Sequence, residues 1–110
     1  MNKWIKVFDN LELAFEKISK NQSVRVKIGS RNLSMGRFND NLYAIDDRCP
    51  HNGESLSKGR INFLGEIICP WHNYRFHLHS GRECQERTKD LKTYPVDINE
   101  KGVFIKLTYE

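Results

Sequence analysis

The sequence lacks the features that mark several large classes of protein. It has no run of about 18 apolar residues, so we expect no membrane-spanning segment. The opening stretch, MNKWIKVFDN, has no apolar core, so we expect no secretory signal and a cytoplasmic location. Three cysteines are too few for the disulfide framework of a small secreted domain. Long repeats and low-complexity tracts are also missing, so 110 residues predict one domain over residues 1–110.

The charge balance is basic without being concentrated. The net charge is +4 and the isoelectric point is about 9.1. Lysines and arginines are scattered and no nucleic-acid recognition motif accompanies them, so we expect no nucleic-acid partner. The positive balance favours a protein partner with an acidic docking face. Apolar residues make up 38% of the chain, which is enough for one modest core.

Alternation of apolar and polar residues dominates the chain and predicts an all-β fold of short antiparallel strands, arranged as a sandwich or small barrel. One short helix is expected near the N-terminus, where apolar side chains of residues 10–19 share a helical face and Asp9 with Glu12 resembles a capping pair. The polar stretch 82–90 is expected to be an exposed loop. Strands are expected at 4–8, 24–28, 32–38, 42–45, 59–63, 65–70, 74–80, 91–98 and 103–109.

Two similar stretches carry the most specific signal. CPHNGESL begins at Cys49 and CPWHNYRFHLHSG begins at Cys69, and His51 and His72 follow within each. Together they read C-x-H-x17-C-x2-H, with a proline after each cysteine to stiffen its loop. Thiolate and imidazole side chains at this spacing indicate a metal centre built from two loops, at about 46–57 and 68–81.

The donor set alone leaves two kinds of metal centre open. Two thiolates and two imidazoles could close around a structural zinc ion. Zinc sites usually take like ligands from one turn, however, whereas here each loop offers one Cys and one His. That division suits a two-iron centre in which one iron takes both thiolates and the other takes both imidazoles.

The same residues resemble the Rieske ferredoxin family. The first stretch matches the family's Cys-x-His-x-Gly-x-x-Leu with Gly53 and Leu56, and the second matches Cys-Pro-x-His followed by Phe76 and Gly81. The resemblance implies a Rieske-like antiparallel β-sandwich or barrel with a two-loop cluster-binding subdomain. It also implies one [2Fe-2S] cluster per chain. Asn73 stands where the family usually has Gly after the second His; if that position needs a positive φ, Asn is the next most tolerant residue.

The cluster is expected to be bound by the cysteine and the histidine of each of the two similar stretches. By the resemblance, the ligands are Cys49, His51, Cys69 and His72. The resemblance implies an electron-transfer protein and not an enzyme. Electrons would pass from a flavin- or NAD(P)H-dependent reductase to a terminal oxygenase of the dioxygenase or monooxygenase type.

The kind of Rieske protein follows from two positions in the loops. Respiratory-complex members carry an additional cysteine in each loop, and the corresponding positions here are Glu54 and Trp71. The chain therefore resembles the oxygenase-associated type. Alternatives are a small electron-transfer subunit of a reductase, as in a nitrite-reductase-like complex, and a zinc-stabilised interaction module.

Other conspicuous side chains receive simpler interpretations. His77 and His79 alternate with Phe76 and are expected to be exposed, not ligands. Cys84 is expected to be an uninvolved thiol, and Trp71 is expected to shield the cluster. A docking face for the partner is predicted from the charged residues near the loops: Arg48, Lys58, Arg60 and Arg75.

Overall fold

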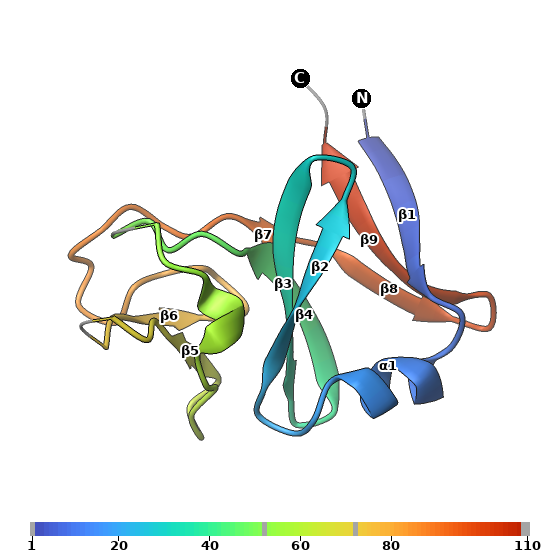
Figure 1. Cartoon of the computed structure of the whole chain (residues 1–110), viewed down its shortest axis with the longest axis horizontal. Helices are drawn as coiled ribbons and strands as arrows, with labels where there is room; N and C mark the ends of the chain where they lie inside the picture. The colour runs from blue at the N-terminus through green and yellow to red at the C-terminus, as the bar shows by residue number, and fades with distance from the viewer. Residues whose placement is uncertain (1, 52, 72, 109–110) are drawn as a thin grey trace.

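The computed structural model describes residues 2–51, 53–71 and 73–108. Over these residues the strands form three antiparallel sheets, ordered β1-β9-β8, β2-β3-β4-β7 and β5-β6 (Figure 1). The predicted all-β class with one short helix is confirmed. The elements in chain order are β1 (Asn2–Phe8), α1 (Leu11–Lys17), β2 (Ser23–Ile28), β3 (Arg31–Phe38), β4 (Asn41–Asp46), the single 3₁₀ turn η1 (Leu56–Lys58), β5 (Glu66–Ile68), β6 (Arg75–His77), β7 (Thr93–Tyr94), β8 (Val96–Asn99) and β9 (Gly102–Thr108).

The two larger sheets enclose the first of two apolar cores. Alternate residues of β9 point into it, and Val103, Ile105 and Leu107 are almost completely buried. Leu33 and Met35 of β3 face them from the other sheet. The helix adds Ala14, and its C-cap residue adds Ile18, to the same core from one end of the sheets. This core gives the body of the molecule a rigid frame from which the loops extend.

The second core belongs to a lobe that projects from one side of that frame (Figure 1). It contains β5, β6 and the long connections on either side of them. Its buried residues are Ile45, Cys49, Leu56, Ile61, Ile67, Cys69, Phe76, Leu78 and Leu91. Two of the predicted cluster ligands are thus part of a hydrophobic core, and the lobe corresponds to the expected two-loop subdomain.

Two local expectations about secondary structure are wrong. The helix is capped by Asn10, whose side-chain oxygen accepts the Leu13 N–H at 2.8 Å, whereas Asp9 forms an ion pair with Lys6. The expected strand at 59–63 is reduced to a single bridge between Ile61 and Ile67.

The cause of the second difference is a side-chain turn. The Asn62 side-chain oxygen accepts the N–H groups of Leu64 and Glu66, both at 3.0 Å, and so closes a tight turn. Two backbone hydrogen bonds, from Asn62 to Glu66 and from Ile68 to Arg60, flank the single bridge. On its other edge β5 pairs with β6, from Glu66 opposite His77 to Ile68 opposite Arg75. Among the described residues, no helix is long and apolar enough to cross a membrane.

Candidate metal centre

The first ligand loop is a compact turn held by its own backbone. The Cys49 N–H donates to the Glu54 carbonyl at 2.9 Å, and the Gly53 N–H donates to the Cys49 carbonyl at 2.8 Å. Gly53 has a φ of +79°, a conformation that costs glycine little and other residues much more. The turn therefore brings the chain back within five residues and leaves His51 between its two ends.

The second ligand loop closes in a related way. The Cys69 N–H donates to the Tyr74 carbonyl at 2.7 Å, just beyond the end of β5. Asn73 lies at a φ of 56°, so this position does require the left-handed conformation and asparagine adopts it. The departure from the usual glycine is thereby explained. His72 lies outside the described residues.

The three described candidate ligands have different environments. Cys49 is 2% exposed and Cys69 is completely buried, and both lie in the core of the lobe. His51 is exposed. A cofactor that joins them would thus have thiolate ligands on its protein side and an imidazole on its solvent side. The chemistry of this donor set fits a cluster whose two irons take different ligands.

The arrangement of the described candidate ligands bears on the kind of metal centre. Within the described part of the chain, no three His, Cys, Asp or Glu side chains gather around one point that could hold a metal ion. A Rieske cluster does not need such a group, because each iron takes only two protein ligands and the sulfides supply the rest. The described residues are therefore compatible with a two-iron centre.

A buried carboxylate fastens the first loop to the body of the protein. One oxygen of Asp47 accepts the Ser34 hydroxyl at 2.7 Å and the Ser57 N–H at 3.0 Å, and the other accepts the Arg25 Nε at 3.1 Å. The Ser55 hydroxyl lies 2.8 Å from both oxygens. Burial of Asp47 would raise its pKa, but the hydrogen bonds together hold the pKa below its usual range. The carboxylate two residues before Cys49 thus remains ionised and joins three segments of chain.

An aromatic contact joins the two ligand loops. The His51 and Tyr74 rings stack with their centroids 3.8 Å apart and their planes 10° apart. Tyr74 itself packs against the core of the lobe. Trp71, which was expected to shield the cluster by packing, is 57% exposed instead. Tyr74 is therefore an aromatic residue that contacts a predicted ligand.

The stretch 82–90 is not simply the exposed polar loop that its composition predicts. Glu83 is completely buried, and its carboxylate receives the Arg87 Nε at 3.0 Å and Nη2 at 2.8 Å. The Arg87 side chain holds the pKa of Glu83 far below its usual range. Nothing in the sequence indicated this pairing or the burial of Glu83, because the stretch is not helical and a spacing of four residues predicts an ion pair only on a helix.

A cavity of about 710 Å³ lies beside the first loop, and its lining includes three cationic side chains and two carboxylates, those of Asp46 and Asp90. Cys49 and His51 form part of its wall, and Arg48, Lys89 and Lys92 bring three positive charges to it. The sequence indicated only the first of these three. The other residues of the predicted docking face include cations already paired with carboxylates: Lys58 lies 3.6 Å from Glu54, and Arg75 lies 4.0 Å from Glu66.

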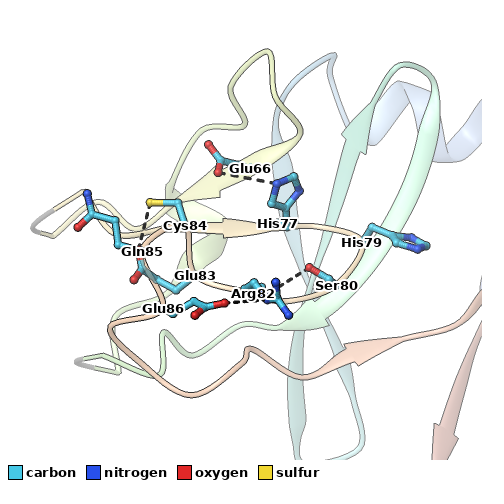
Figure 2. A pocket seen from close by; sticks show the side chains of 9 residues that line it. All are labelled: Glu66, His77, His79, Ser80, Arg82, Glu83, Cys84, Gln85 and Glu86. Carbon is cyan, nitrogen blue, oxygen red and sulfur yellow. Dashed lines mark hydrogen bonds and ion pairs between the residues drawn. The ribbon is translucent and has the colours of Figure 1, made fainter.

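A second pocket, of about 750 Å³, lies on another side of the lobe (Figure 2). His77 and His79 are exposed there, as expected, and His77 lies 4.0 Å from the buried Glu66. The Cys84 thiol donates to the Glu83 carboxylate at 3.2 Å. None of these three side chains is joined to the predicted ligands by a described contact.

Comparison with known proteins identifies the domain. Residues 3–95 match the Rieske [2Fe-2S] domain. The ferredoxin component of the naphthalene 1,2-dioxygenase/salicylate 5-hydroxylase systems of a Ralstonia species is 34% identical over 91 residues, covering 82% of this chain and 86% of that protein. The naphthalene 1,2-dioxygenase ferredoxin component of Pseudomonas aeruginosa is 32% identical, covering 96% and 97% of the two chains.

Solved structures agree with this assignment. The complex of reduced oxygenase and oxidized ferredoxin in carbazole 1,9a-dioxygenase contains a chain with a TM-score of 0.77 and 28% identity, covering 93% of this chain and 91% of that one. The ferredoxin of carbazole 1,9a-dioxygenase from Nocardioides aromaticivorans IC177 has a TM-score of 0.79 at 19% identity, which indicates a shared fold. The relatives are thus ferredoxin components and not catalytic enzymes. With two buried cysteines and an exposed histidine on two paired loops, this chain belongs to the Rieske [2Fe-2S] domain family.

Proposed function

We propose that this protein is a one-electron carrier with one [2Fe-2S] cluster, in a single domain spanning residues 1–110. The proposed ligands are Cys49, His51, Cys69 and His72. The main observation in support of this proposal is that the thiols of Cys49 and Cys69 are buried whereas the imidazole of His51 is exposed. When bound, such a cluster accepts and returns a single electron.

The residues around the site suit such a carrier. The apolar core of the lobe keeps water away from the two thiols, and Leu56, Ile67 and Phe76 supply completely buried side chains to it. A dry environment on the thiol side tunes the reduction potential of a bound cluster. His51 remains exposed, so a partner can approach the imidazole side closely.

We propose that the electrons come from a flavin- or NAD(P)H-dependent reductase and go to a terminal oxygenase, in the cytoplasm. The names of the relatives support this role, since they are ferredoxin components of dioxygenase systems. The related carbazole 1,9a-dioxygenase ferredoxin has been seen in complex with its oxygenase. An acidic docking face on the partner would complement the charges of Arg48, Lys89 and Lys92 beside His51.

The cofactor can be tested on the protein purified without oxygen. We expect about two irons and two acid-labile sulfides per chain, and an EPR signal of a Rieske cluster after reduction with dithionite. Cys69→Ser should lose the iron, whereas the matched control Cys84→Ser should keep it. Stoichiometric zinc without sulfide would refute the cluster and support the zinc-stabilised module.

The docking face can be tested by electron transfer to a ferredoxin-dependent dioxygenase. Replacement of Lys89 and Lys92 by Gln should slow the second-order rate and weaken its dependence on salt. Replacement of Lys17 and Lys101, which are exposed on α1 and on the β8–β9 turn away from the lobe, is the matched control. Equal rates for both double variants at low salt would contradict a docking role for the cavity.

A further inference from the structure

Three side chains from three segments form a layered stack behind the exposed imidazole. The Tyr74 ring stacks on the His51 ring at a centroid distance of 3.8 Å. The guanidinium carbon of Arg87 also lies 3.8 Å from the centroid of the Tyr74 ring. Two groups centred at that distance over one ring would overlap if they shared a face. Tyr74 is therefore enclosed between an imidazole on one face and a guanidinium on the other.

The outer layer of the stack is fixed by a buried anion. The Glu83 carboxylate is completely buried and binds the Arg87 guanidinium through two nitrogens, Nε and Nη2. It also accepts the Arg87 backbone N–H at 2.7 Å, so the arginine is held at both ends of its side chain. The carboxylate oxygen that accepts Arg87 Nη2 also accepts the Cys84 thiol, at the edge of the pocket in Figure 2.

We propose that Tyr74, clamped by the Glu83–Arg87 ion pair, is a positioning residue that fixes the His51 imidazole at the orientation needed for cluster binding. This inference rests on the proposed function, because it takes His51 as a ligand. It assigns a role to three residues outside the ligand set.

The physical reason is the exposure of the ligand. An exposed histidine on a loop samples several rotamers, and ordering it on binding costs free energy. A parallel ring on one side removes that freedom before the cluster arrives, in the way that second-layer hydrogen bonds orient histidines in other metal sites. The arginine completes the clamp, because it prevents Tyr74 from moving away from His51.

The Glu83–Arg87 pair of the clamp has no net charge. Arg87 and Glu83 neutralise each other, so the stack orders His51 without adding net charge behind it. Removal of one partner leaves the other charge uncompensated near the cluster. A remaining cation favours the reduced state and raises the reduction potential, whereas a remaining anion lowers it.

The orienting role is tested with Tyr74→Leu against Tyr74→Phe, which keeps the ring. We expect wild-type EPR lines and nitrogen couplings for Tyr74→Phe. Tyr74→Leu should give broadened lines and a cluster lost to a chelator about 10-fold faster. Iron content and circular dichroism of each variant show that the loaded, folded protein is compared. Unchanged lines and an unchanged rate of cluster loss in loaded Tyr74→Leu would overturn the inference.

The charge of the clamp is tested by measuring reduction potentials. Glu83→Gln should raise the potential and Arg87→Met should lower it, whereas Arg87→Lys should leave the potential near wild type with broadened lines. Shifts of the same sign in Glu83→Gln and Arg87→Met, or no shift in either, would overturn the inference. A wild-type protein without a Rieske signal would instead refute the proposed function.

Discussion

Replacement of Asp47 by Asn should destabilise the protein much more than its small chemical change suggests. One carboxylate oxygen takes the Ser34 hydroxyl and the Ser57 N–H, and an amide oxygen can take both. The other oxygen would become an NH₂ group that faces the donating Nε of Arg25. The variant therefore loses one charge-assisted hydrogen bond and gains a donor–donor contact, at a site where Asp47 is almost completely buried.

The magnitude follows from that count. A hydrogen bond to a charged group contributes about 1.5–3 kcal/mol, so we expect the free energy of unfolding to fall by about that amount. With a urea dependence of about 1.5 kcal/mol per molar, the unfolding midpoint should fall by about 1–2 M. Circular dichroism in urea, on wild type and variant at equal iron content, measures the shift.

Asp40→Asn is the matched control for this prediction. Asp40 also pairs with an arginine, Arg37, but its side chain is 60% exposed. Exposed ion pairs contribute about 0–1 kcal/mol, so the control should lower the midpoint by much less than Asp47→Asn. Equal shifts for the two variants would refute the reasoning that burial makes the Asp47 network strong.

Four further substitutions, at three positions, test the backbone and core of the lobe by urea unfolding. Gly81→Ala should lower the free energy of unfolding by about 3 kcal/mol, because φ is +79° and an added Cβ would lie 1.9 Å from the Leu91 carbonyl oxygen. Asn73→Gly should change it by less than about 1 kcal/mol, whereas Asn73→Val, at a φ of 56°, should lower it by about 1–3 kcal/mol. Phe76→Ala should lower it by about 3–5 kcal/mol, since Phe76 is completely buried. Equal unfolding midpoints for Asn73→Val and Asn73→Gly, or no loss of stability in Gly81→Ala or Phe76→Ala, would contradict these interpretations.

Much of the fold could be predicted because its signals are local. Alternation of apolar and polar residues locates β1 to β4 and β9 to within about two residues of their observed bounds. The expected strand at 59–63 is reduced to a single bridge, because the Asn62 side chain takes two N–H groups of the turn that follows it. Alternation describes which face a residue takes, and it contains no information about such a turn.

The site could be predicted only in part, for a different reason. Cysteine and histidine spacing marks ligands directly, because the chemistry of a cluster needs those donors. Tyr74 and Glu83 act through contacts between segments that are distant in sequence or through burial. The sequence near Tyr74 looks like the start of an ordinary strand, and the sequence near Glu83 looks like an exposed loop. The stacking of Tyr74 on His51 depends on the meeting of two loops, which follows from the packing of the lobe.

The lobe should be sensitive to acid because buried carboxylates fasten its loops. Asp47 holds the first loop, and Glu83 holds the segment that clamps Tyr74. Both pKa values lie below their usual range in the folded protein. In the unfolded chain these groups bind protons at about pH 4, before the folded groups do, so acid favours the unfolded state.

Their contribution to stability is therefore complete above about pH 5 and is lost as the pH falls through the folded pKa values. We expect the free energy of unfolding to decrease steadily below pH 5, and to decrease less in Glu83→Gln, which has no proton to bind there. Urea unfolding of the two proteins at several pH values between 3 and 7 measures both slopes. Parallel slopes for wild type and Glu83→Gln would contradict a depressed pKa at Glu83. The noncovalent clamp would then owe its strength to packing alone, with no contribution from the buried charge.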